Sequence, residues 1–451
     1  MAADGSCAWR STVAGRILNI RGFSVALTQP KDLKHCRFDP LSPAALANPY
    51  PFYAWLREHD PLHWGIGSSG EEGGCWYITR YAESIAALKD PRLGREIWRV
   101  LPERTQPEHA EPPASSAAQD GDQAILEMSR QWMVLRDPPV HTRLRSLVQR
   151  AFTPRMIERL RPRMEQIVNE LVDQVIASGR MEVLHAFAEP LPVMIIAELL
   201  GVPPEDQALF MPWSRALAAV IEFEQSEEVR RVGSAAVVAL SDYLRQIIAQ
   251  RRRQPQDDLI SALITIEDEG HRPSEHELIG TITQLLFGGN EPVIHLIGNG
   301  LLALLHHPDQ LADWRRTIGS PAAQTETAID ELMRYDSSVQ MTFRNALEEV
   351  ALGGKRLQQG DPVAIVMGAA NRDPQLFPDP DRLDLARTPN RHLSLGVGIH
   401  YCIGAALAKA EANAAFACLL DRLPDLALAT DALQWRRAVA VRGLVELPVI
   451  F

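Results

Sequence analysis

Residues 395–404, Leu395-Gly-Val-Gly-Ile-His-Tyr-Cys402-Ile-Gly404, form the segment that decides the fold. Its three glycines let the backbone turn tightly beside a flat ligand and leave amide N–H groups to point at the sulfur of Cys402. A helix expected from Ala405 to about Leu420 would bring its positive N-terminal end to the same sulfur and stabilise a thiolate. The alternative is a buried structural cysteine in a glycine-rich turn, the usual place for a lone cysteine.

The segment resembles the heme-binding signature of the cytochrome P450 superfamily, Phe-Gly-x-Gly-x-His-x-Cys-x-Gly. It differs only at the first position, where Leu395 replaces the aromatic residue. The resemblance implies that Cys402 is the axial ligand of the iron of heme b (iron protoporphyrin IX). A thiolate in that position pushes electron density onto the iron and favours O–O cleavage. We expect Leu395 to alter packing or redox potential without removing the ligand.

Other segments resemble the family at residues that support the heme. Glu331-Leu-Met-Arg334 resembles its Glu-x-x-Arg pair, whose side chains share one helix face at this spacing. Arg382, in Pro380-Asp-Arg382-Leu, fits the third, downstream member of that cluster. The resemblance implies a structural role for these three residues, which hold the backbone under the heme.

The two heme propionates need cationic or hydrogen-bonding partners from several elements. His141 and Arg145 lie four residues apart in Asp137-Pro-Pro-Val-His141-Thr-Arg-Leu-Arg145 and so share a helix face. The resemblance implies that these two, together with Arg344 and His392, contact the propionates. Each alone is more typical of a surface residue, but four at matching positions favour the cofactor interpretation.

A long apolar helix is expected from Ser274, which can cap it, to about His306. So long and apolar an element must run buried through the protein. In the family this helix carries Ala/Gly-Gly-x-Asp/Glu-Thr, whose acid and hydroxyl relay protons during dioxygen activation. This chain has Gly288-Gly-Asn290-Glu291-Pro292, so the acid is kept and proline replaces the alcohol. We predict catalytic roles for Gly288, Asn290, Glu291 and Pro292.

Pro292 cannot donate to the carbonyl of Gly288, and its ring crowds that carbonyl, so the sequence predicts a helix bulge. One hypothesis is that Pro292 keeps the oxygen-binding groove open while ordered water replaces the lost hydroxyl. A second is that the substrate supplies the hydroxyl. A third is peroxide-driven or radical-coupling chemistry, in which proton delivery matters less. The alternative is a tolerated kink with little consequence.

Composition limits the class of protein. The 451 residues include 46 Lys+Arg and 57 Asp+Glu, a net charge of -11 that argues against nucleic acid as a partner. Five scattered cysteines do not favour a disulfide scaffold or a metal cluster. The longest apolar stretches are too short and too interrupted by charge to span a bilayer. We therefore expect a cytoplasmic monomer without nucleic-acid or membrane partners.

The fold class expected is mainly α with a small β part. The resemblance implies the cytochrome P450 fold, a single large domain with heme between the long central helix and the cysteine loop. Residues 1–38 are predicted to be a poorly ordered N-terminal extension and residues 39–451 the heme-thiolate domain. The segment 102–123, rich in Pro, Ala, Ser and Glu, is predicted to be a long mobile loop, either a lid or plain disorder. Strands are expected near 76–79 and as hairpins over 350–367, with turns at 353–354 and 360–361, and a final strand pair near 439–451. A helix is expected after the first of these strands, from about Tyr81 to Lys89.

The function that the resemblance implies is a monooxygenase of secondary metabolism that inserts one atom of O2 into a small organic substrate. Without a fused flavin or iron–sulfur domain, electrons from NAD(P)H must arrive through a separate ferredoxin and ferredoxin reductase. These would dock near Cys402, where Arg143, Arg150 and Lys409 offer positive charge.

Phe287, Val339 and Ala440 are expected to line the substrate pocket. Besides peroxide-driven or radical-coupling oxidases, the competing class is a non-catalytic heme-thiolate sensor. The retained Glu291 favours catalysis, because a sensor needs no proton relay.

Overall fold

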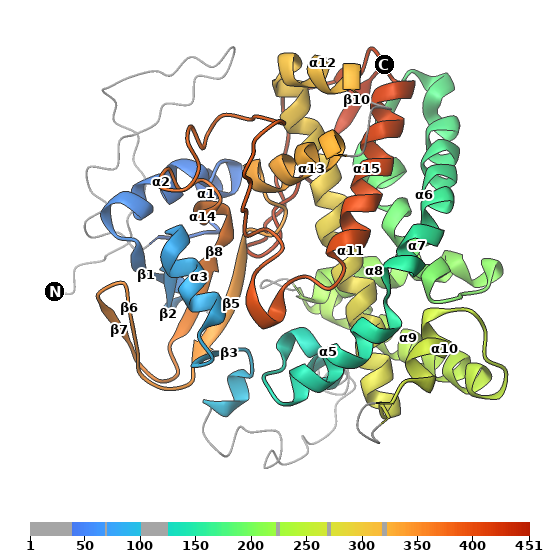
Figure 1. Cartoon of the computed structure of the whole chain (residues 1–451), viewed down its shortest axis with the longest axis horizontal. Coiled ribbons are helices and arrows are strands. Elements are labelled where there is room, and N and C mark those ends of the chain that lie inside the picture. The colour runs from blue at the N-terminus through green and yellow to red at the C-terminus, as the bar shows by residue number, and fades with distance from the viewer. Residues whose placement is uncertain (1–37, 68–69, 101–124, 222–225, 268–271, 318–322) are drawn as a thin grey trace.

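The computed structural model describes residues 38–67, 70–100, 125–221, 226–267, 272–317 and 323–451. The predicted N-terminal extension, except for Phe38, and the predicted loop 102–123 lie outside these residues. In the described part, a five-stranded sheet lies on one side of the molecule and most of the helices on the other (Figure 1). The expected mainly helical architecture with a minor β part is confirmed.

The helices follow the predicted spacing closely. The helix expected over Tyr81–Lys89 has those bounds, and the one expected from Ala405 to Leu420 ends two residues later, at Arg422. The helices are α1 Pro43–Ala47, α2 Tyr50–His59, α3 Tyr81–Lys89, α5 Val140–Ala151, α6 Pro154–Val175, α7 Pro190–Leu199, α8 Gln207–Ile221, α9 Glu227–Arg253, α10 Leu259–Thr265, α11 Glu275–His306, α12 Pro308–Thr317, α13 Ala323–Tyr335, α14 Met367–Ala370 and α15 Ala405–Arg422.

Three sheets make up the β part. The large sheet has the order β1-β2-β8-β5-β3, with β2 and β8 parallel and the other neighbours antiparallel. A three-stranded sheet has the order β4-β10-β9, and β6 and β7 form a hairpin. The strands are β1 Leu62–Gly67, β2 Gly70–Ile78, β3 Leu93–Gly94, β4 Arg180–Glu182, β5 Met341–Ala346, β6 Val350–Leu352, β7 Lys355–Leu357, β8 Pro362–Val366, β9 Ala427–Leu428 and β10 Pro448–Ile450.

Two strand predictions need correction. The turn at Gly353-Gly354 joins β6 to β7 as expected, but β8 pairs with β2 and β5 instead of extending that hairpin. Near the C-terminus only 448–450 form a strand, and its partners are β4 and β9. The residues just before it turn back through a single bridge between Trp435 and Leu444. Local alternation in the sequence predicted extended backbone correctly, but the partner strands are distant in the chain.

The central helix α11 begins as predicted. Ser274 accepts a hydrogen bond from the Glu277 amide, and the Glu277 carboxylate accepts one from the Ser274 amide, a complete capping box. The helix continues to His306 with Pro292 inside it. It runs through the middle of the molecule beside α15 (Figure 1).

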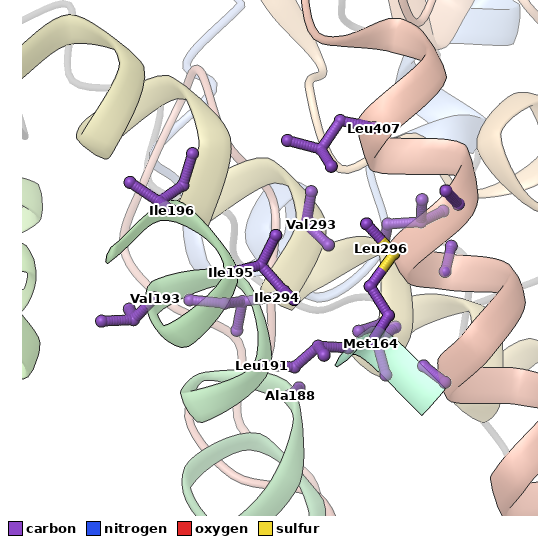
Figure 2. Packing of buried hydrophobic residues seen from close by; sticks show 14 of the residues in the cluster. Met164, Ala188, Leu191, Val193, Ile195, Ile196, Val293, Ile294, Leu296 and Leu407 are labelled. Carbon is purple, nitrogen blue, oxygen red and sulfur yellow. The ribbon is translucent and has the colours of Figure 1, made fainter. Parts of the chain in front are cut away.

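The apolar side chains of α11 form the centre of the core. Complete burial of a leucine or isoleucine side chain contributes about 1.5–3 kcal/mol to stability. The packing of these side chains against the neighbouring helices therefore fixes the position of α11. Figure 2 shows side chains of α11 packed among those of α6, α7 and α15: Val293, Ile294, Leu296, Met164, Ile195, Ile196 and Leu407.

Within the described residues, α9 is the one helix long and apolar enough to cross a membrane by length and composition. This differs from the expectation drawn from the sequence. The helix packs along α8 and α10 and contacts α11, so it is an integral part of the helical half of the fold.

Candidate cofactor site

Cys402 lies in a tightly turned loop that ends at the start of α15. Gly396 and Gly398 have φ of 70° and 78°, in the left-handed region that glycine adopts without strain. The Cys402 amide donates to the carbonyl of Leu395 at 2.8 Å, which closes the loop. The next helix begins at Ala405 with Gly404 as its N-cap, so the sulfur lies by the helix N-terminus as predicted.

The electrostatics of the sulfur are balanced between burial and positive partners. Burial raises the pKa of Cys402, whereas the Gly404 amide and the charge of Arg145 lower it. A metal cation bound at this sulfur would favour the thiolate further, because a coordinating thiol loses its proton.

Imidazole and guanidinium groups from distant segments gather beside this loop. The rings of His141 of α5 and His400 are in contact, with centroids 4.2 Å apart and planes tilted by 50°. Arg145, one turn after His141, donates to the Tyr401 carbonyl at 2.6 Å. Arg344 of β5 is buried and donates only to its own strand, at Thr342 Oγ1 and the Phe343 carbonyl.

The positive field of this cluster keeps its imidazoles neutral. Burial, followed by the charge of Arg145, lowers the pKa of His141 to about 4. Burial and the charges of Arg95 and Arg344 lower the pKa of His400 to about 2. One carboxylate, Asp137, contributes to the field, and it accepts from the backbone amides of Arg95 and Glu96.

Two nitrogen atoms of this cluster make no hydrogen bond to the described residues. Nδ1 of His141 and Nε of Arg95 are buried and have no hydrogen-bond partner in the described part of the chain. Buried polar groups normally have partners, so these atoms indicate an anionic ligand. A flat cofactor with two carboxylates and a metal at Cys402 fits this donor set.

His392 was predicted to contact the propionates, and in the structure its ring bonds to other groups. Its Nε2 lies 3.2 Å from Oδ1 of Asp330, and its Nδ1 accepts from the Ser394 amide. His400 takes its place. The sequence signal was available, since His400 is the histidine of the signature itself. Arg95, which lies just after β3, also belongs to the cluster, but no pattern in the sequence pointed to it.

The Glu331–Arg334 pair is formed and fully buried, with bonds of 2.7 and 2.8 Å. Arg382 is not its third side chain. Arg387 lies over the carboxylate at 3.1 and 3.2 Å, whereas Arg382 is exposed and offers only its carbonyl to Arg334. Two arginines five residues apart in one loop cannot be distinguished by a short pattern, because the path of the loop decides which one turns inward.

This carboxylate cluster is linked to the cysteine loop. Arg334 donates to the carbonyls of Asn371 and Pro380. The Asn371 side chain in turn accepts from the Leu393 amide at 2.6 Å, at the start of the loop. The buried ion pair therefore holds the segment that leads to Cys402.

The four residues predicted on α11 do not form one cluster. Gly288 is exposed inside an otherwise buried helix, and a Cβ built there would meet no atom within 4 Å. Asn290 is fully buried, donates to Ser214 Oγ of α8 at 2.8 Å and leaves its Oδ1 without a partner among the described residues. Glu291 instead pairs with Arg436 of the C-terminal segment at 2.5 Å. Pro292 follows Glu291 directly in α11 and precedes the buried stretch that begins at Val293.

The predicted substrate-lining residues lie in two places. Val339 bridges to Val441, and the Gln340 amide donates to the Ala440 carbonyl at 2.8 Å, so these two segments adjoin. Phe287 stacks on Trp132, with ring centroids 5.3 Å apart.

A cavity of about 570 Å³ opens beside Cys402, between α5, α6 and α15. Arg145, Arg161 and Lys409 line it together with Glu158 and Glu326. Of the predicted docking cations, only Lys409 lines this cavity.

The other two predicted docking cations are engaged elsewhere. Arg143 forms an ion pair with Glu277, and Arg150 donates to the Glu267 carbonyl.

Comparisons with known proteins agree with this geometry. The family model described as cytochrome P450 matches residues 219–424. The chain is 38% identical over 406 residues to the polyketide biosynthesis cytochrome P450 PksS of Bacillus subtilis, covering 89% of this chain and 95% of that protein. It is 40% identical over 403 residues to 6-deoxyerythronolide B hydroxylase of Saccharopolyspora erythraea, covering 89% and 95%. The solved structure of P450BioI in complex with an acyl carrier protein carrying hexadec-9Z-enoic acid matches with a TM-score of 0.79 and 38% identity, covering 91% of this chain and 100% of that one.

Proposed function

The chain belongs to the cytochrome P450 family, has its fold and is a P450-type oxidoreductase; we propose that it hydroxylates a small organic substrate of secondary metabolism. The observation that carries this proposal is the set of cationic and imidazole groups beside Cys402, two of whose buried nitrogens have no hydrogen-bond partner among the residues that the structure describes. This donor set fits a heme with its two propionates.

We assign roles at the cofactor on that basis. Cys402 would bind the iron, and His141, Arg145, Arg344 and His400 would hold the propionates. Heme b supplies the capacity to activate O2. The chain's own contribution is to fix the cofactor, to exclude water by packing α11 against α7 and α15, and to deliver protons from α11.

The substrate class is proposed from the relatives. Those named above act, by their names, in polyketide biosynthesis or on 6-deoxyerythronolide B, and the P450BioI structure holds a fatty acyl chain on a carrier protein. We propose an apolar polyketide or acyl compound, lying between Phe287 of α11 and the adjoining segments at Val339 and Ala440.

We also propose that electrons come from NAD(P)H through a separate ferredoxin reductase and ferredoxin, in the cytoplasm. The exposed side chain of Tyr401 lines the cavity at Cys402 together with the cations Arg145, Arg161 and Lys409, and Ile399, two residues earlier in the chain, is exposed as well. An apolar centre with positive charges suits a small acidic electron carrier.

The test compares Cys402→Ser with Cys418→Ser, a matched change of a buried cysteine in α15. We expect the ferrous–CO difference spectrum of the wild type and Cys418→Ser to show the thiolate-specific Soret position, and Cys402→Ser to lose it. With a surrogate ferredoxin system, the wild type should incorporate one atom of labelled O2 into product. The protein would instead be a sensor if it shows the thiolate spectrum but incorporates labelled oxygen into none of the substrates that shift its spin state.

A further inference from the structure

Three polar side chains interrupt the apolar surface of α11 at a regular spacing. Glu291, His295 and Asn299 follow one another at four-residue intervals and therefore share a helix face. All three meet the segment 435–444, which precedes β10. This segment is called the C-terminal hairpin below, after its bridge between residues 435 and 444.

Each contact with the C-terminal hairpin is specific. Arg436 lies 2.5 Å from Oε2 of Glu291 and also contacts Nε2 of His295. A Cβ on Gly443 would overlap the His295 ring, so only glycine permits this approach. Asn299 donates to the Arg442 carbonyl at 3.1 Å. The hairpin is therefore held against the polar face of α11.

The arrangement fixes the protonation of His295. An arginine N–H can only donate, so Nε2 of His295 must accept and the ring is neutral, with its proton on Nδ1. Burial, together with the charge of Arg436, lowers the pKa of His295, although the adjacent Glu291 carboxylate acts in the opposite direction. Nδ1 is buried, with no hydrogen-bond partner in the described ranges.

Glu291 is ionised in the same arrangement. Burial by itself would raise the pKa of this carboxylate, but the charge and the hydrogen bond of Arg436 lower it. Oε2 of Glu291 lies 3.4 Å from Nε2 of His295. The carboxylate and the imidazole are therefore adjacent, and Arg436 keeps both of them free of an additional proton.

The charges around His295 show what would follow if Arg436 withdrew. On its own helix Glu291 faces it, and Glu189, just before α7, adds a second negative charge. Glu189 is itself paired with Arg215 and His185. Without Arg436, the two carboxylates would favour a proton on Nε2 of His295, shared with Glu291.

We propose that His295 is the second proton-carrying group of this enzyme, in place of the alcohol that Pro292 displaces, and that Arg436 on the C-terminal hairpin gates it. When Arg436 withdraws, Nε2 of His295 takes one proton from solvent and passes it to Oε2 of Glu291, and His295 returns to its neutral form. The step moves one proton and no electrons: an N–H bond forms and then breaks at Nε2 of His295, and an O–H bond forms at Oε2 of Glu291. Glu291 shares a helix face with Gly288, three residues earlier, and so carries the proton toward the exposed glycine. His295 acts through Glu291 and is a positioning residue.

This inference rests on the proposed monooxygenase function, and its test separates the two. His295→Gln keeps a polar side chain of similar reach but cannot carry a proton, and His306→Gln makes the same substitution at the exposed C-terminal end of α11. We expect His295→Gln to lower the share of reductant recovered in product by roughly tenfold, with hydrogen peroxide formed instead, and to change the solvent isotope effect. His306→Gln should retain both wild-type values.

A second measurement does not depend on turnover. In the wild type, the lowered pKa of His295 stabilises the folded holoenzyme at high pH, and this contribution is lost as the pH falls. In Arg436→Gln the pKa should rise above that of the unfolded chain, so the contribution is instead lost as the pH rises. Thermal unfolding from pH 5 to 8 should show this reversal, and adding His295→Gln should abolish it.

The relay is overturned if His295→Gln and His306→Gln couple reductant to product equally, or if the pH dependence of Arg436→Gln survives in the double variant. In either case, the proposed monooxygenase function would still hold if these variants show the thiolate spectrum and incorporate labelled oxygen into product.

Discussion

At the scale of single residues, Glu411 is a carboxyl group enclosed by helices. It lies on α15 nearly without exposure, and neither of its oxygens has a hydrogen-bond partner within the described segments. Burial raises its pKa well above the ordinary value of 4.5. The group is therefore protonated at neutral pH, since an unpaired carboxylate in this position would be costly.

We predict that Glu411→Gln raises stability at alkaline pH. Because the folded-state pKa is raised, the folded chain holds the proton more tightly, and wild-type stability declines as the pH rises from 4.5 through the folded-state value. Glutamine has a similar shape and does not ionise, so its midpoint of thermal unfolding should exceed the wild type at pH 8 and approach it near pH 5. A lower midpoint at every pH would instead mean that Glu411 is ionised and paired.

Pro292 also belongs to this scale. If His295 supplies the proton that the family's alcohol normally carries, a hydroxyl restored at position 292 should make His295 dispensable. We predict that Pro292→Thr raises the coupling of reductant to product in the His295→Gln background by several-fold, and less in the wild type. The measurement is product formed per NADH consumed. No effect in either background would support the interpretation that Pro292 is a tolerated kink.

At the scale of elements, the sequence predicted what depends on local pattern. The start of α11 at Ser274, the bounds of α3 and the position of α15 behind Cys402 follow from capping residues and helical spacing. The partner of Glu291 could not be predicted in this way, because Arg436 is 145 residues away and lies in a segment without periodicity. The contact of His392 with Asp330, and that of Arg387 rather than Arg382 with Glu331, could not be predicted either, because loop paths, and not spacing, decide them.

Substitutions in the loop between α14 and the cysteine loop can test whether Arg387, and not Arg382, covers the Glu331 carboxylate. We predict that Arg387→Ala lowers the free energy of unfolding by about 3 kcal/mol, because it leaves part of a buried carboxylate uncompensated. Arg382→Ala removes only an exposed side chain and should change it by less than about 0.5 kcal/mol. Chemical unfolding of the two variants measures the difference. Equal losses would contradict the arrangement in which Arg387 covers Glu331.

At the scale of the whole molecule, the net charge of -11 hides a local excess of positive groups. The cavity at Cys402 collects Arg145, Arg161 and Lys409, and three basic residues against two acidic ones line it. An acidic electron carrier would therefore be guided by the local field despite the overall charge.

We predict that Arg161→Glu slows electron transfer from an acidic ferredoxin by roughly three- to tenfold at low ionic strength. Arg231→Glu is a matched control, because each arginine pairs with a glutamate three residues earlier, and α9 does not line the cavity. The difference should shrink near 1 M salt, where charges are screened within about 3 Å. Stopped-flow reduction under CO measures the rate, and identical rates for the two variants would move the docking surface elsewhere.

The position of β10 has a consequence for biosynthesis. This strand is the middle one of its sheet, between β4 and β9, and the Leu447 amide beside it bonds to Glu182, 265 residues earlier. A ribosome must therefore synthesise the chain through residue 450 before β4 can find its neighbour. Pairing over such separations is slow, and an unpaired edge invites aggregation meanwhile. Chaperone supply and translation rate should thus limit the yield of native protein, and a stop just before residue 448 should leave the sheet without its centre.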